Sequence, residues 1–284
     1  MLTRLASQTA PRILRSHFPP RRAMSTFKLD KTIFNPTLYK ELTDVWLGGV
    51  DLKGEELPDE ALKRWFRGSP DEKIAFDALC RAKFALALQS IGPEKIPKST
   101  AQPFLDEIRE AASNDSSGDG SQAAWTALSL TILLDQIPRN IYRTGAGLRD
   151  VYVHYDTLSY ALSRTLFSPS SPIPRPDQHP QWRHSFAHVL WFHLPLVHSE
   201  SIEAHDLLGG IQREYAQELE KSEGLKASKF FLGPAMEEEA KHRALLERFG
   251  RYPHRNQAVG RQSTEEERRF LEEGGDTFGV AQNK

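Results

Sequence analysis

The sequence predicts an all-α protein, and three observations lead to this prediction. Apolar residues recur at helical spacing through most of the chain, as in the long stripe supplied by Ile74, Leu79, Phe84 and Leu88. Alternating β-branched runs bounded by turn residues, which mark strands, are scarce. Proline, glycine and capping residues separate the apolar segments from one another. We therefore expect an array of antiparallel helices joined by short connections.

The first half of the chain divides into several expected helices. Ser69 is followed by Pro70, Asp71 and Glu72, which is the pattern of a cap, a proline and acids in a first helical turn. A Gly/Ser/Asp-rich loop over residues 113–122 marks a weak candidate for a domain boundary. The expected helices are 36–47, a segment opening at Pro58, a long helix from Ser69 to about Gly92, and 104–112.

Prolines predict where two helices of the second half end. Pro138 and Pro195 lack an N–H donor and disfavour helix in the residue before them. We therefore expect the helix over 123–136 to break at Pro138 and the helix over 182–194 to end at Pro195. A further helix is expected over 148–166, between these two.

Capping residues predict the remaining boundaries. Ser199 is expected to cap a helix that runs to about residue 221. Pro234 is expected to open another helix, with Gly250 as its C-terminal stop. Ser263 and Glu266 have the spacing of a capping box, which predicts the start of the last helix.

Length and composition predict a single helical domain, residues 30–284, with a Pro-rich surface insertion near 168–180. The formal net charge of −1 creates no overall field that would favour nucleic acid or an anionic membrane. No apolar run approaches the roughly 20 residues of a membrane span. The single cysteine, Cys80, leaves no intrachain disulfide and fits a reducing compartment. We therefore expect neither a nucleic-acid partner nor a membrane partner.

The N-terminal segment differs in composition from the rest of the chain. Residues 1–29 are rich in arginine and contain no acid before Asp30. An Arg-rich, acid-free and partly amphipathic start is typical of a mitochondrial presequence, and a disordered basic tail is the alternative. We expect localisation to mitochondria, in the matrix, and a cytosolic form if translation begins at Met24. The basic residues are Arg4, Arg12, Arg15, Arg21, Arg22 and Lys28.

A dense polar cluster follows directly on a strongly apolar expected helix that contains Leu128, Leu130, Ile132, Leu133 and Leu134. An unpaired buried polar group costs about 1–3 kcal/mol, so these side chains need partners from the fold or from a ligand. The purely structural interpretation is a network of salt bridges and helix caps that holds two helices together. The segment reads LLDQIPRNIYR, and its polar residues are Asp135, Gln136, Arg139, Asn140 and Arg143.

Two later segments have a similar polar character. His198, Ser199 and Glu200 lie at the expected start of a helix, where anions are favoured. A basic run extends from His242 to Arg261. Because all three clusters lie at helix ends, and the basic residues of one need the acids of another as acceptors, we expect the clusters to meet in space.

One hypothesis for function is a pocket, possibly catalytic, for a small anionic or phosphorylated ligand. Arginine suits carboxylate and phosphate, so Arg139, Arg251 and Arg255 are expected to hold charge. The histidine that moves a proton would be His198 or His254, and Asp135 or Glu200 would orient it. The other expected ligand-binding residues are Gln136, Asn140, Ser199, His242, Asn256 and Arg261.

The second hypothesis is a helical scaffold that binds a protein or peptide partner without catalysis. Convergence of the polar clusters on one enclosed site would favour the ligand pocket, and a long open concave face would favour the scaffold. The chain has no HExxH motif, no cysteine pair and no ordered carboxylate triad, so we predict no metal site. It also lacks the GxGxxG, P-loop and GxSxG motifs, and the sequence identifies no cofactor.

Several long motifs resemble those of domain-of-unknown-function family 924. They are Trp65-Phe66 with the later Phe76, Asp77 and Phe84, then LLDQIPRN, PLVHSE, and the run from FGRYPHRN through GRQSTEE. The resemblance covers roughly residues 35–278. It implies an all-helical fold similar to the tetratricopeptide-repeat superfold, and it implies that the site residues named above are the recurring polar residues of the family. His205 departs from the family pattern, which tends to have glutamine there.

The presequence hypothesis can be tested by imaging. A fluorescent protein fused behind residues 1–30 should accumulate in mitochondria, because the Arg-rich, acid-free composition is what import requires. The full chain started at Met24 is the control and should stay cytosolic. A diffuse cytosolic signal from the 1–30 fusion would contradict the hypothesis.

Overall fold

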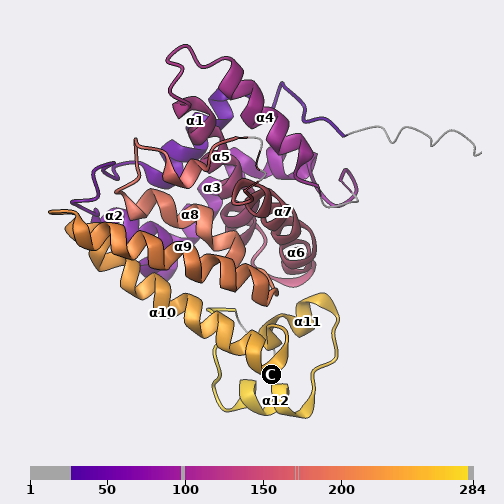
Figure 1. The fold of residues 1–284 in the computed structure, drawn as a ribbon. Coiled ribbons are helices and arrows are strands. Elements are labelled where there is room, and N and C mark those ends of the chain that lie inside the picture. The colour runs from indigo at the N-terminus through magenta and orange to yellow at the C-terminus, as the bar shows by residue number, and fades with distance from the viewer. Residues whose placement is uncertain (1–26, 97–99, 170, 172, 281–284) are drawn as a thin grey trace, which may run out of the picture.

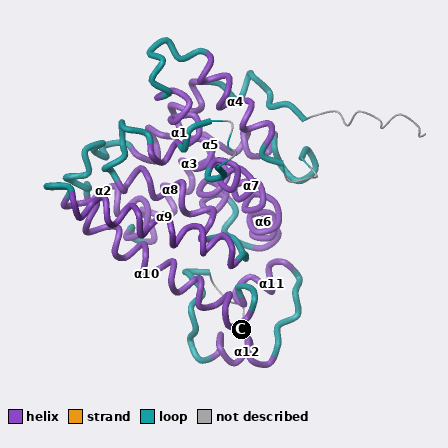
Figure 2. The backbone as a smooth tube through the Cα atoms, viewed as in Figure 1, coloured by secondary structure: helices purple, strands orange, loops and turns teal. Residues whose placement is uncertain are grey.

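The structure is a computed structural model that describes residues 27–96, 100–169, 171 and 173–280. Every regular element within these ranges is a helix, which confirms the all-α prediction (Figures 1 and 2). The expected presequence lies outside the described residues, except for its last three positions.

A central helix, α5 (Ser121–Ile141), organises the fold. Its buried residues occur on all sides, including Leu128, Leu130, Ile132 and Leu134, none of which is exposed. A helix that is apolar all round must be surrounded by others. The helices that pack on α5 are α1 (Pro36–Leu47), α3 (Pro70–Ser90), α4 (Gln102–Ser113), α7 (Asp156–Leu166) and α8 (Phe186–Val197) (Figure 1).

A helical pair covers the other side of α8. α9 (Ile202–Lys221) and α10 (Lys226–Phe249) contact each other, and both contact α8. The chain after α10 forms a small C-terminal lobe at the end of that helix, with α11 (Asn256–Val259) and α12 (Glu265–Glu272) (Figure 1). The lobe has its own small apolar cluster of Leu245, Leu246 and Tyr252.

Short elements connect the longer helices. α2 (Asp59–Leu62) continues into the π-helical turn η1 (Lys63–Arg67), and α6 (Gly145–Asp150) continues into a second one, η2 (Val151–Tyr155). Two 3₁₀ turns are η3 (Pro176–Gln178), inside the Pro-rich stretch, and η4 (Pro253–Arg255), after α10. Single π turns inside helices are often found at functional sites, and η2 leads directly into α7.

Several predicted boundaries are confirmed. α1 has the expected bounds. Ser69 caps α3 and forms a capping box with Glu72. Gly250 ends α10 with a φ of 69°, a left-handed conformation that glycine adopts without strain.

The predictions that prolines limit three helices are wrong. Pro138, Pro195 and Pro234 lie inside α5, α8 and α10 respectively. Pro138 and Pro195 fall in the last turn of their helices, so each removes only one backbone hydrogen bond close to an end. The packing of α5 and α8 on their neighbours keeps the helices continuous across these positions.

Two caps and one apolar stripe also need correction. Ser201, rather than Ser199, caps α9, because its side chain accepts from the Ala204 N–H. The last capping box is formed by Thr264 and Glu267, one residue later than expected.

The stripe predicted on α3 is divided between two faces of the helix. Phe84 and Leu88 are fully buried, whereas Ile74 and Leu79 are 66% and 40% exposed. The prediction that Ile74 and Leu79 share the buried face of Phe84 and Leu88 is therefore wrong.

Truncation in α5 should show how far the fold depends on this helix. Leu133→Ala removes a fully buried side chain and should destabilise the protein by about 2–5 kcal/mol. Leu86→Ala removes the same groups from a side chain that is 64% exposed and should change stability by less than about 0.5 kcal/mol. Urea unfolding followed by circular dichroism gives both values, and equal losses would contradict the central place of α5.

Candidate functional site

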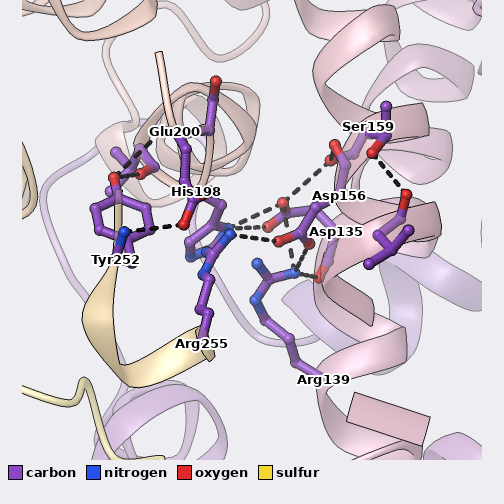
Figure 3. A network of polar contacts seen from close by, with 12 residues as sticks. Asp135, Arg139, Asp156, Ser159, His198, Glu200, Tyr252 and Arg255 are labelled. Atoms are coloured by element: carbon purple, nitrogen blue, oxygen red, sulfur yellow. Dashed lines mark hydrogen bonds and ion pairs between the residues drawn. The ribbon is translucent and has the colours of Figure 1, made fainter. Parts of the chain in front are cut away.

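The three polar clusters meet where α5, the end of α8 and η4 approach one another (Figure 3). Asp135 and Arg139 lie one turn apart near the end of α5. His198 follows the last residue of α8, and Arg255 is the last residue of η4. Some members of each cluster therefore come together here, as the sequence predicts, whereas other members pair elsewhere in the fold.

An aspartate–histidine pair forms the centre of the site. Asp135 is fully buried, and the Nδ1 atom of His198 lies 3.0 Å from each of its carboxylate oxygens. Ser159 Oγ donates to Asp135 Oδ1 at 3.3 Å, and Gln136 Nε2 donates to Oδ2 at 2.6 Å. Since an ionised carboxylate can only accept, His198 must donate from Nδ1, and its Nε2 atom keeps a lone pair.

Charges alternate along a ladder from α5 to η4. Arg139 Nη1 lies 2.7 Å from Asp156 Oδ1 and 3.7 Å from Asp135 Oδ1, and it also donates to the Asp135 carbonyl at 2.5 Å. Arg255 Nη1 then lies 3.3 Å from the other oxygen of Asp156. The two arginines and two aspartates balance each other, which is what four largely buried charges require.

Aromatic rings hold the second arginine of this ladder in place. The Arg255 guanidinium lies 4.5 Å from the centre of the Tyr152 ring and 4.7 Å from that of Tyr252. A guanidinium makes favourable cation–π contacts with aromatic rings at such distances. The two rings therefore help to hold Arg255 in place.

Burial keeps the histidines of the site uncharged at neutral pH. Burial, with the nearby Arg139 charge, lowers the pKa of His198. Burial is also the main cause that lowers the pKa of His242 to about 2 and that of His254 to about 3. Burial alone would raise the pKa of the Asp135 carboxyl, but His198, Arg139 and the hydrogen bonds it accepts outweigh this and lower it.

Some hydrogen-bond donors at the site have no acceptor. The Nη2 atom of Arg139 and the Nε atoms of Arg255 and Arg261 are buried and have no hydrogen-bond partner among the described residues. Buried N–H groups are nearly always satisfied in folded proteins. The two carboxylate oxygens of Asp156 are likewise buried with ion pairs but no hydrogen bond, so both donors and acceptors of the ladder are left without one.

Two other predicted histidines lie nearby, His242 next to His198 and His254 against Tyr252. The His242 ring centre lies 6.4 Å from that of His198, and its Nδ1 atom donates to the Glu238 carbonyl at 2.8 Å. Phe278, near the C-terminus, stacks on His242 with ring centres 3.6 Å apart. His254 stacks on Tyr252 at 5.7 Å.

Other predicted site residues lie in separate networks. Glu200 does not orient a histidine, because it accepts from the Tyr252 backbone N–H at 2.9 Å and pairs with Arg261. Ser199 contributes its backbone carbonyl, which accepts from the Tyr252 hydroxyl at 3.2 Å. The remaining pairs do not reach the aspartate–histidine pair: Asn140 and Arg143 bind Asp77, and Arg251 and Asn256 bind Glu267.

Sequence reasoning missed Asp156, Ser159 and Tyr152, all of which contribute to the site. A signal for them existed. Tyr152, Asp156, Ser159 and Ser163 are separated by four, three and four residues, so they share one face of a helix that was expected to pack against its neighbours. Polar residues repeated on a packing face need partners, and that requirement could have identified Asp156 as the counter-charge of an arginine.

The described residues contain no group of three or more His, Cys, Asp or Glu side chains arranged to hold a metal ion. None of their helices is both long enough and apolar enough to cross a membrane.

Removing Arg139 should test the charge ladder. In Arg139→Ala, Asp135 and Asp156 lose a shared counter-ion in a buried environment, and we expect a loss of about 3 kcal/mol in unfolding free energy. Arg143→Ala is the matched control, since this half-exposed arginine pairs with Asp77 and should contribute at most about 1 kcal/mol. Chemical denaturation measures both, and a small loss in Arg139→Ala would mean that the ladder does not depend on this residue.

Comparisons with known proteins bear on the fold and on family membership. No curated protein matches the chain. It is similar to the solved structure of a protein of unknown function, ATU0120, from Agrobacterium tumefaciens, with a TM-score of 0.54 and 25% sequence identity over 86% of this chain and 100% of that one. The family model described as "Bacterial protein of unknown function (DUF924)" matches residues 42–275. The chain therefore belongs to the DUF924 family.

Proposed function

We propose that the protein binds a small anionic ligand beside Asp135 and His198, and that this pair performs acid–base chemistry on it. The observation that carries the proposal is the hydrogen bonding of His198 Nδ1 to both oxygens of a fully buried carboxylate. A carboxylate in this position fixes the tautomer and the orientation of the ring. It also stabilises the charged ring that forms when Nε2 accepts a proton.

The environment of His198 suits a general base. Its lowered pKa keeps the ring neutral at pH 7, so the Nε2 lone pair is available. Proton transfer would form an imidazolium at a site where Asp135 already carries the opposite charge. The reaction class this supports is removal of a proton from the ligand, or from a water molecule that attacks it.

The free N–H groups of the arginines support an anionic ligand. Arg139 and Arg255 are already neutralised by Asp135 and Asp156, so the site has no large excess of positive charge. Recognition would therefore depend on directed hydrogen bonds from the Arg139 Nη2 and Arg255 Nε atoms. Carboxylate and phosphate oxygens are the acceptors that fit such donors best.

Convergence of the polar clusters also supports a ligand site over a peptide-binding scaffold. The aspartate–histidine pair and the charge ladder lie together near the ends of α5 and α8 (Figure 3). His242 lies next to His198. A purely structural role is the competing interpretation, because the same contacts fasten α5, α7, α8 and η4 to one another. The experiment must therefore separate ligand binding from stability.

A thermal-shift screen against small carboxylates and phosphates tests the proposal. A ligand at 100 times its Kd should add about 2.7 kcal/mol of stability to the wild-type protein. His198→Gln retains a side chain able to donate to Asp135, so it should fold but lose the ligand-induced shift. Asn140→Ala is the control, because Asn140 binds Asp77 and lies outside the site. A shift that survives in His198→Gln would contradict the proposal.

The protonation state of His198 gives a second readout that needs no ligand. Side-chain ¹⁵N NMR at pH 7 should show a neutral ring with its proton on Nδ1, and the ring should become protonated at a pH below the ordinary histidine pKa of 6.5. A catalytic step that uses this base should therefore lose activity at a lower pH than one that uses an unshifted histidine. A ring that is protonated at pH 7 could not act as the base.

A further inference from the structure

The chain that follows α12 places an aromatic ring on the histidines near the site. Residues 273–280 form this C-terminal tail, and the Phe278 ring stacks on His242 with ring centres 3.6 Å apart and an angle of 19° between the ring planes. The same ring lies 5.3 Å from the ring centre of His254 and 6.4 Å from that of Tyr252. At this spacing Phe278 covers one face of His242, which is only 6% exposed.

The C-terminal tail has few other attachments to the fold. The N–H groups of Gly274 and Gly275 donate to carbonyls in the last turn of α12. Within the described residues, the backbone of residues 276–279 forms no hydrogen bond to any part of the chain outside the tail. Asp276 is attracted to the exposed Lys241 of α10, but solvent weakens such an attraction. The Phe278 ring is therefore the main contact that fixes the tail.

Two glycines form the joint between α12 and the tail. Gly274 has a φ of 86°, a conformation that glycine adopts without steric cost. Gly275 passes so close to the Phe270 ring that a Cβ atom there would lie 2.3 Å from it. Hinges consist of a few residues that absorb large backbone rotations, and consecutive glycines do so with little resistance. This joint therefore has the chemistry of a hinge.

Phe278 itself has a strained backbone. Its φ is 51°, in the left-handed region, where the Cβ atom of any residue other than glycine lies too close to the following carbonyl oxygen. Such a conformation persists only where the surrounding structure holds it. Here it is held by the stacking on His242 and by packing against the apolar cluster that contains Tyr252. Release of the ring would therefore relieve strain while it breaks these contacts.

We propose that residues 273–280 are a lid on the histidine side of the ligand site, with Phe278 as its latch and Gly274 and Gly275 as its hinge. In the closed state the lid covers His242, whose ring centre lies 6.4 Å from that of His198. In the open state the His242 ring becomes accessible beside the proposed base. That this region belongs to a ligand site rests on the function proposed above.

A reagent for neutral imidazole measures how often the lid opens. Diethyl pyrocarbonate transfers an ethoxycarbonyl group to an unprotonated ring nitrogen, and ethyl carbonate leaves. His242 suits this reagent because burial lowers its pKa to about 2, so the ring is neutral at pH 7. Its Nδ1 atom donates to the Glu238 carbonyl, so the lone pair that reacts is on Nε2. Mass spectrometry of the digested protein gives the rate at each histidine.

Two other histidines are internal references in the same sample. His184 is half-exposed and should react without any opening of the protein. His193 is fully buried in the core and should react only when the protein unfolds. In the wild-type protein His242 should react about ten times or more slower than His184 and about ten times or more faster than His193. A rate equal to that of His193 would show that the tail does not open by itself, and a rate equal to that of His184 would show that it does not cover His242.

Substitution of Phe278 tests the latch. Phe278→Ala should raise the rate at His242 about tenfold or more, towards that of His184. Phe278→Tyr keeps an aromatic ring and should retain the wild-type rate. Phe230→Ala is the matched control, because this phenylalanine on α10 is 70% exposed. An unchanged slow rate at His193 shows that each variant is folded, and equal rates at His242 in Phe278→Ala and the wild-type protein would refute the latch.

These measurements need no ligand, so they fail or succeed independently of the proposed function. Protection of His242 by Phe278 without any ligand-induced thermal shift would support the lid and count against the function. A thermal shift that is lost in His198→Gln, together with unchanged reactivity of His242 in Phe278→Ala, would support the function and overturn the lid.

Discussion

The carboxylate of Asp135, fully buried near the end of the central helix α5, constrains the structure around it. A buried charge without partners would cost several kcal/mol, and groups from three helices or their ends contact it. Gln136 and Arg139 come from α5 itself, Ser159 from α7 and His198 from the end of α8. Arg139 in turn forms an ion pair with Asp156, and Asp156 forms another with Arg255, which follows α10 in the chain. The ends of the helices meet here because this charge must be satisfied.

The helical class, the bounds of α1 and the cap of α3 could be predicted because they depend on local chemistry. Apolar periodicity and capping hydrogen bonds involve residues a few positions apart. Proline positions misled the prediction because local propensity competes with tertiary packing. The N–H that Pro138 lacks matters little in a helix whose sides are covered by several others. The stripe on α3 was misplaced for a related reason, since its outer turns also carry apolar residues.

The composition of the site could be predicted only in part. Asp135, Arg139, His198 and Arg255 were identifiable because their polar groups follow apolar helices and need partners. Which acid would meet which base depends on the packing of α5 against α7 and α8, and sequence spacing does not encode that packing. Glu200 pairs with Arg261, Asn140 binds Asp77, and Arg251 pairs with Glu267. These predicted site residues therefore belong to separate networks.

The ion pair between Asp156 and Arg255 joins the C-terminal lobe to the centre of the fold. If the lobe detached by itself, Arg255 and Tyr252 would leave together, so Asp156 would lose one counter-ion and Tyr152 would lose its cation–π contact. The free energy needed to open the lobe therefore depends partly on its contact with α7 and, through Asp156, on the pairing with Arg139 of α5. The lobe and the start of α7 consequently belong to one cooperative unit, and segments more than 90 residues apart in the sequence should gain or lose their protection together.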